Sequence, residues 1–227
     1  MPCNPRKNGF SLVEVLVSVV IVAILAAVLL SVISGVRASN QTAKCRVNIR
    51  SILAAVQLYA NEHDAVLPLH NRAKDGEVIA LWHIDDVAPY LEYTRPKSID
   101  QVSDISDVFR CPADEYFGER SSGSGLSREE ISYGYNLHLG KGGKSGDYRL
   151  VSMYNVANPS DQVVVADSGH ASEDGMVAYV LNPKSGTSGM PFGRHNGMSN
   201  IGYLDGHVSL IDPSELDADS DAWYPDR

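Results

Sequence analysis

Five side chains in the C-terminal third of the sequence are of types that bind divalent metals or exchange protons. They are Asp167, His170, His195, Asp205 and His207. Carboxylates and imidazoles ligate metals and serve as general acids and bases. However, no HExxH or similarly close ligand pair accompanies them, and no GxSxG sequence supports a Ser/His/Asp hydrolase. We therefore expect a structural role, in which His195 hydrogen-bonds a loop to a neighbouring hairpin.

That hairpin is predicted from Asp205-Gly206, which separates two short β-prone segments, residues 200–204 and 207–211. A type I′ turn requires positive φ at both central positions, and Asp-Gly is among the sequences that favour it. The alternative is that Asp205 ligates a cation together with His195 or His207.

Five acids follow the hairpin and supply oxygen atoms of the kind that calcium prefers. They are Asp212, Glu215, Asp217, Asp219 and Asp221. The segment lacks the central Gly and the closing Glu of an EF-hand loop. A solvated acidic tail and a calcium site are therefore the two interpretations, and no other cofactor is predicted.

Glu14 is an ionisable residue at the edge of a long apolar segment. The 22 residues from Val15 to Val36 carry no charge, and at about 1.5 Å of helical rise each they reach roughly 33 Å, the hydrocarbon thickness of a bilayer. A single membrane span is predicted, and Arg6 and Lys7 before it favour a cytoplasmic N-terminus with the rest of the chain outside. A carboxylate at this depth is costly unless a cation pairs with it or it reaches the headgroups.

A cleaved secretory signal peptide is the alternative for this segment, with cleavage near Val36-Arg37-Ala38. The apolar region of such a peptide has only about 7–15 residues. The longer run found here favours a membrane span.

The residues before the span resemble the type IV prepilin signal. Lys7-Asn8-Gly9 is followed by Phe10-Ser11-Leu12-Val13-Glu14, which is similar to that signal's basic leader, Gly, Phe, and Glu five places on. The resemblance implies that a prepilin peptidase cuts after Gly9 and methylates the amine of Phe10. It also implies that Glu14 pairs with the amine of a neighbouring subunit in a filament.

The C-terminal part resembles one branch of the pilin-like proteins, marked by His, nine residues and Asp-Gly. Here His195 is followed by NGMSNIGYL and then Asp205-Gly206. Residues 43–49, 59–68, 109–112, 132–136 and 163–167 also fit. The resemblance implies a pilin-like subunit that meets other pilin-like subunits and the inner-membrane assembly machinery. Type II secretion pseudopilins, which it also resembles, bind calcium in their C-terminal region.

Removal of residues 1–9 would leave two cysteines, Cys45 and Cys111. The compartment outside the cytoplasm is oxidising, so a disulfide between them is one prediction. Two buried free thiols are the alternative, because pairing cannot be deduced from sequence alone.

One long helix, from about Ser11 to Asn61, must carry the apolar segment and continue beyond it. After Arg37, apolar residues recur at spacings of three and four, which is typical of an amphipathic helix. The apolar positions are Cys45, Ile49, Ile52, Leu53, Val56 and Tyr59, and the polar residues Lys44, Arg46, Asn48, Arg50 and Gln57 mostly lie on other faces. After the leader, residues 1–9, this divides the helix into a membrane or filament-core part, 10–36, and an amphipathic part, 37–63.

Residues 64–227 are predicted to form an external α+β domain whose antiparallel sheet packs on the helix. Strands are expected at residues 131–135, 148–154, 162–166, 176–181, 200–204 and 207–211. A short helix is expected within Leu81 to Tyr93, interrupted by Pro89, with loops at 121–127 and 140–146.

The composition narrows the classes of function. The chain has 227 residues and a formal net charge of −9, which argues against nucleic acid as a partner. We expect a structural subunit of a secretion pseudopilus or a pilus and no enzyme activity. The alternative is a periplasmic enzyme or ligand-binding protein that uses the helix only as an anchor. Glu14 distinguishes the structural subunit from the anchored protein, because a helix that serves only as an anchor does not need a carboxylate at this position.

Overall fold

The computed structural model describes residues 11–74, 77–91, 107–114, 131–141, 148–169, 180–184 and 189–225. Gly9, Phe10, His170 and the loop 121–127 lie outside these ranges. The chain divides into two compact units, Met1–Asn40 and Gln41–Arg227, and each is described by itself.

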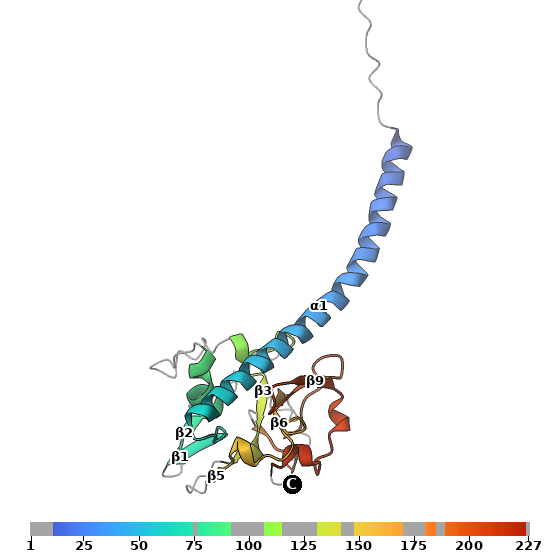
Figure 1. The fold of residues 1–227 in the computed structure, drawn as a ribbon. Coiled ribbons are helices and arrows are strands. Elements are labelled where there is room, and N and C mark those ends of the chain that lie inside the picture. Colours follow the sequence, from blue (N-terminus) through green and yellow to red (C-terminus); the bar gives the residue numbers. More distant parts are fainter. Residues whose placement is uncertain are drawn as a thin grey trace, which may run out of the picture. The chain divides into compact units, whose positions relative to one another are not determined.

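One α-helix, α1, covers Leu12–Glu62, within one residue of the predicted bounds at each end (Figure 1). It ends where Asp64 and Ala65 adopt positive φ angles of 52° and 61°. The Ala65 N–H bonds the carbonyl of Ala60 at 2.8 Å, which satisfies one of the carbonyls left open at the helix end. The left-handed residues, together with Pro68 soon after, stop the helix.

Five strands form the central sheet, in the order β7-β3-β6-β8-β9. Their bounds are Tyr133–Asn136 (β3), Val163–Asp167 (β6), Val180–Leu181 (β7), Ser199–Tyr203 (β8) and Val208–Ile211 (β9). Neighbours are antiparallel except β3 and β7, which are parallel. The α+β class is confirmed, but a purely antiparallel sheet is wrong. A long connection leads from β6 to β7, so no hairpin forces β7 to run antiparallel.

Four of the predicted strands correspond to β3, β6, β8 and β9, with ends shifted by at most two residues. β7 lies at the end of the predicted segment 176–181. The prediction for 148–154 is wrong in its second half, where a 3-10 helix, Met153–Asn155, follows the short strand β5, Arg149–Leu150. β5 pairs with β4, Gly140–Lys141, which begins a segment predicted to be a loop.

A second small hairpin was not predicted. β1, Asn71–Lys74, pairs antiparallel with β2, Glu77–Leu81. The helix expected within Leu81 to Tyr93 is present as two short pieces, a π-helix Trp82–Val87 and a 3-10 helix Ala88–Leu91. Pro89 lies in the first turn of the second piece, where a missing N–H costs no helical bond.

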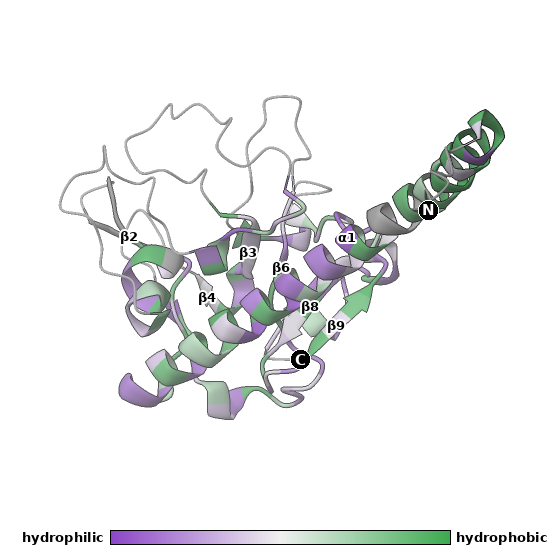
Figure 2. Ribbon diagram, turned by 90° about the horizontal axis from the view of Figure 1, so that it is seen from above, coloured by the Kyte–Doolittle hydropathy of each residue, from purple (hydrophilic) through white to green (hydrophobic). Residues whose placement is uncertain are grey.

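The part of α1 in the second unit lies across β3, β6, β8 and β9 (Figure 2). Its predicted apolar face is buried at Cys45, Ile49, Ile52, Leu53 and Val56. The contact with β8 is close, because a Cβ on Gly202 would lie 2.7 Å from Cγ2 of Ile49 and 2.9 Å from Cδ1 of Leu53. A larger residue at position 202 would therefore require the side chains of Ile49 and Leu53 to shift.

The opposite face of the sheet is covered by the C-terminal segment. Neighbouring residues of a strand point to opposite faces, so Ile201 points away from the helix that Gly202 contacts. Ile201 belongs to a second buried cluster with Val163, Leu181 and Trp223. The end of the acidic segment is therefore anchored by Trp223, whereas its acids stay at the surface: Asp212 is half-buried, and Glu215, Asp217, Asp219 and Asp221 are exposed. The segment is solvated as predicted, but it is folded onto the sheet.

The hairpin between β8 and β9 is present, but its turn differs from the predicted type I′. The Gly206 N–H bonds the carbonyl of Tyr203 at 2.9 Å, and the Tyr203 N–H bonds the carbonyl of His207 at 3.0 Å. Positive φ occurs at Gly206 (95°) and not at Asp205. This is the three-residue hairpin in which a glycine bulge follows a turn.

Cys45 on α1 and Cys111 in the segment after Phe109 form a disulfide. Their Cα atoms lie 5.3 Å apart, and both residues are completely buried. The bond fastens the start of the domain-facing half of α1 to a loop 66 positions further along the chain.

The hairpin geometry predicts different effects for two substitutions. Gly206→Val places a β-branched residue at φ of 95° and should lower the melting temperature of the detergent-solubilised chain by roughly 2–8 °C. Asp205→Asn should change it by less than about 3 °C, because an exposed ion pair contributes little. Circular dichroism with calcium, with zinc and with chelator measures both. A chelator-sensitive wild type with a low-melting, chelator-insensitive Asp205→Asn would show instead that Asp205 binds metal.

The disulfide predicts the number of reactive thiols. The full chain has three cysteines, so alkylation of the unfolded, unreduced chain should modify Cys3 alone, whereas all three should react after reduction. Intact mass spectrometry counts the adducts. Three adducts before reduction would exclude the bond.

Candidate functional site

The first described residues form a cap at the start of α1. The Val13 N–H donates to Oγ of Ser11 at 3.3 Å, and the Ser11 N–H donates to Oε2 of Glu14 at 2.9 Å. This reciprocal pair is a capping box, which satisfies two N–H groups that a helix start leaves open. Sequence analysis singled out Glu14 for its charge and missed this second role, although Ser-x-x-Glu is the signature of the box.

The first half of α1 exposes apolar side chains over its whole length. From Leu12 to Leu30 the large hydrophobic residues are between 48% and 88% exposed. By length and composition α1 is the one helix in the described part of the chain that can cross a membrane, with a mean hydropathy of 3.2 over its most apolar 18 residues. Such a surface requires lipid or other helices around it.

His195 lies in the domain interior, away from the hairpin to which it was expected to bond. Its Nε2 lies 3.2 Å from Oδ2 of Asp167 and 3.6 Å from Sγ of Cys111, and its Nδ1 lies 3.2 Å from Oγ1 of Thr42. The imidazole therefore connects α1, the cystine and the end of β6. A structural role is supported, but the partner predicted for His195 is wrong.

Arg194 and two carboxylates form a buried charge network beside His195. The Arg194 guanidinium lies 3.4 Å from Asp114 and 3.6 Å from Asp167, and it donates to the carbonyls of Ser132 and Ser168. The three charged side chains are at most 5% exposed. Sequence analysis missed Arg194 and Asp114, and the only available signal was the position of Arg194 directly before His195.

Asp205 and His207 form a separate, exposed pair at the hairpin. Oδ1 of Asp205 accepts from the backbone N–H of His207 at 3.0 Å and lies 2.6 Å from its Nδ1. Desolvation raises the pKa of Asp205, but the hydrogen bonds from the backbone and ring of His207 outweigh it and lower that pKa below its usual value. The carboxylate thus stabilises the loop conformation.

The candidate metal ligands therefore fall into two groups. Asp167 and His195 are brought together with Cys45 and Cys111, with ligand atoms within 4.8 Å of one another. Asp205 and His207 belong to the hairpin instead. His170 lies outside the described residues.

Asn48 on α1 was predicted to lie off the apolar face, and it is buried. Its Nδ2 donates to the carbonyl of Arg110 at 2.8 Å and lies 3.2 Å from the hydroxyl of Tyr133. Burial raises the pKa of Tyr133, and Asp167 adds to the increase, so this hydroxyl stays protonated. The polar side chain joins α1 to β3 and to the segment that contains Cys111.

The acidic segment uses carboxylates for local turns. Asp212 accepts from the N–H and hydroxyl of Ser214, and Asp217 accepts from the N–H of Asp219. The indole of Trp223 donates to the carbonyl of Asp217 at 3.0 Å. Calcium binding by the five acids stays a prediction.

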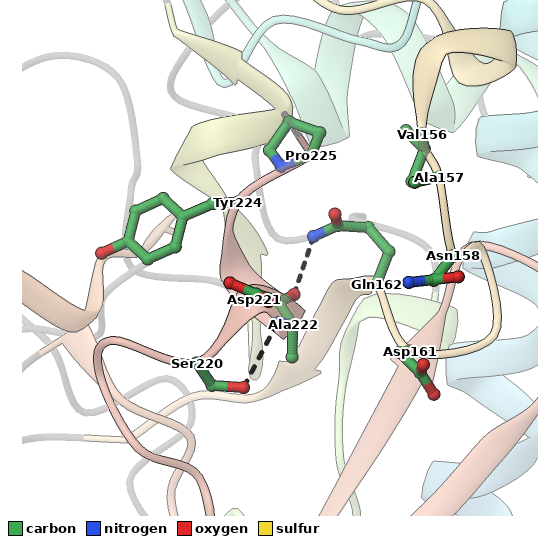
Figure 3. Close-up of a pocket in the computed structure, with 10 residues that line it drawn as sticks. All are labelled: Val156, Ala157, Asn158, Asp161, Gln162, Ser220, Asp221, Ala222, Tyr224 and Pro225. Atoms are coloured by element: carbon green, nitrogen blue, oxygen red, sulfur yellow. Dashed lines mark hydrogen bonds between the residues drawn. The ribbon is translucent and has the colours of Figure 1, made fainter. Parts of the chain in front are cut away.

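The end of this segment borders a pocket with residues 156–158 (Figure 3). One wall is held by the Gln162 amide, which donates to the carbonyl of Ala222 at 2.7 Å, and by Ser220, whose Oγ accepts from the Ala222 N–H. Asp161 and Asp221 lie at its rim among the labelled side chains. The hydrogen bonds explain why the segment folds back onto β6.

Comparison with known protein families gives a match at the N-terminus. Residues 4–30 match the family described as the prokaryotic N-terminal methylation motif. That range contains Gly9, Phe10 and Glu14 and the first part of α1. No curated protein and no solved structure matches the chain. The motif covers the start of one exposed apolar helix, so the N-terminal part of this chain is similar to that of prepilin-type proteins such as pilins and pseudopilins.

Proposed function

We propose that this chain is a pilin-like structural subunit that assembles into a filament through the first half of α1. The supporting observation is the methylation motif at residues 4–30, which includes the start of an apolar helix. A prepilin peptidase removes residues 1–9 on the cytoplasmic side and methylates the amine of Phe10. Before assembly the helix spans the inner membrane, and residues 64–227 lie outside.

The exposed apolar surface of α1 gives assembly its physical basis. Large side chains from Leu12 to Leu30 are exposed on the isolated chain. Neighbouring copies can cover them in a filament as lipid does in the membrane, because both surroundings are apolar. Transfer from one to the other then costs little hydrophobic free energy.

Glu14 supplies the specificity that apolar contacts lack. Its carboxylate would be costly in a helix bundle unless a cation met it, and the amine of Phe10 on a neighbouring chain is such a cation. The Ser11 N–H donates to Oε2 of Glu14. The other oxygen has lone pairs for an incoming amine.

The burial of His195 and Asp167 favours this function over an anchored enzyme that would use them as acid and base. His195 is 5% exposed and Asp167 is not exposed at all. A substrate cannot reach a general acid or base at that depth without opening the domain. The buried pair instead joins α1 to the sheet.

Processing is predicted to require Gly9. Gly9→Leu should leave residues 1–9 attached in more than about nine chains of ten, because the peptidase accepts a small residue before the cut. Gly35→Leu is the matched control and should be processed normally, since a Cβ there meets nothing within 4 Å. N-terminal sequencing and intact mass of the native proteins show whether residues 1–9 have been removed. A wild-type N-terminus at Met1 or at Ser39 would refute the proposal.

Assembly is predicted to require the charge of Glu14 rather than its hydrogen bond. Glu14→Gln keeps a capping side chain but removes the charge, and Glu14→Leu removes both. Both variants should be processed and membrane-bound, yet at least about tenfold depleted from sheared filaments. Quantitative immunoblots of the membrane and filament fractions measure the ratio.

Ser11→Ala is the matched control, because it removes the other half of the capping box and leaves Glu14 charged. It should enter filaments at the wild-type level. Normal incorporation of Glu14→Gln would contradict the pairing role.

A further inference from the structure

Four side chains of metal-binding types meet inside the domain from four places in the chain. Cys45 comes from α1, Cys111 from the segment after Phe109, Asp167 from the end of β6, and His195 from the loop before β8. One ligand atom from each lies within 4.8 Å of the others, and all four residues are buried. Two sulfurs, an imidazole and a carboxylate form a donor set that zinc prefers in proteins.

The separations between these atoms suit a tetrahedral ion. Nε2 of His195 lies 3.6 Å from Sγ of Cys111 and 3.2 Å from Oδ2 of Asp167. In a tetrahedral zinc site with bonds of about 2.0–2.3 Å, neighbouring ligand atoms are roughly 3.3–3.8 Å apart. The first of these distances lies within that range and the second is about 0.1 Å below it. The two sulfurs must separate when their bond is broken, and the remaining ligand atoms already lie within 4.8 Å of one another.

Neighbouring residues hold the ligands as outer-shell residues do in metal sites. Oγ1 of Thr42 lies 3.2 Å from Nδ1 of His195, which leaves Nε2 directed at the sulfur and the carboxylate. The N–H and the amide of Asn200 donate to Oδ2 of Asp167 at 2.7 and 3.1 Å. Oδ1 of the same carboxylate is buried without a hydrogen bond. Such contacts orient an imidazole and a carboxylate before the metal arrives.

We propose that Cys45, Cys111, Asp167 and His195 form a zinc site when the two cysteines are reduced, and that the disulfide excludes the metal. A dithiol reductant gives two electrons and two protons to the cystine and becomes a disulfide itself. Zn²⁺ then displaces the two thiol protons and binds both thiolates. The freshly synthesised chain reaches this state without a reductant, because its cysteines begin as thiols.

The site therefore has two exclusive states, each of which links α1 to the domain. Zinc holds the sulfurs apart by coordination, whereas oxidation joins them directly. The disulfide joins α1 to the segment of Cys111 only, whereas zinc would also bind the end of β6 and the loop before β8. The proposal does not depend on filament assembly, since every residue involved lies in the second unit.

Metal analysis of the full chain in detergent tests the proposal, with Cys3→Ser throughout so that Cys45 and Cys111 are the only cysteines. The anaerobically reduced chain, given Zn²⁺ and desalted, should hold one ion per chain. The oxidised chain should hold none. With Co²⁺ in place of Zn²⁺, the reduced chain should show thiolate-to-cobalt charge transfer and the intense visible bands of tetrahedral cobalt.

Matched variants assign the ligands. Asp167→Asn and His195→Asn should lower zinc affinity of the reduced chain by at least about tenfold, and Thr42→Val should lower it by about 10–100-fold. Asp205→Asn and His207→Asn change the same residue types in the exposed pair and should bind zinc as the wild type does. Circular dichroism of each variant confirms that it is folded.

If a buried substitution prevents folding, the cobalt spectrum of the reduced wild type still shows whether thiolates bind the metal. A folded, reduced wild type that binds no zinc, or that binds cobalt without thiolate bands, overturns the proposal. Equal zinc binding in the oxidised chain, or equal loss in the two control variants, overturns it as well.

Discussion

The packing of one face of α1 against the central sheet is the contact on which the rest of the domain depends. Gly202 allows Ile49 and Leu53 to approach β8 so closely that even a methyl group would intrude. Around this contact the larger buried cluster forms, and it includes Cys45 and Cys111. The same helix thus has one half built for apolar surroundings on every side and another half that forms the wall of a protein core.

Buried charges near this contact make the arrangement specific rather than merely stable. Asp114 and Asp167 are enclosed with a single guanidinium, that of Arg194. Replacement of a buried ion network by apolar residues is often neutral or stabilising, whereas removal of one member leaves an uncompensated charge. The network therefore penalises any packing in which the segment of Asp114, the end of β6 and the loop before β8 do not meet. His195 extends this dependence to the helix through Thr42.

Local patterns in the sequence predicted the elements well and their long-range partners poorly. The spacing of Ile49, Leu53 and Val56 was enough for the buried face of α1, and Asp205-Gly206 was enough for a hairpin, because each pattern acts within a few residues. The exact turn type was not predictable, because Asp205-Gly206 is compatible both with a type I′ turn and with a turn in which only Gly206 has positive φ. Arg194 could not be foreseen, because its partners come from distant segments.

The disulfide has a mechanical consequence. Cys45 lies five positions beyond Asn40, at the start of the unit that α1 enters. Tension applied along α1 from its N-terminal end would therefore meet a covalent crosslink within about the first turn and a half of that unit. The load would pass to the segment around Cys111 before it could peel Ile49 or Leu53 from the sheet. The disulfide would thus oppose peeling of α1 from the sheet when the helix is pulled from this end.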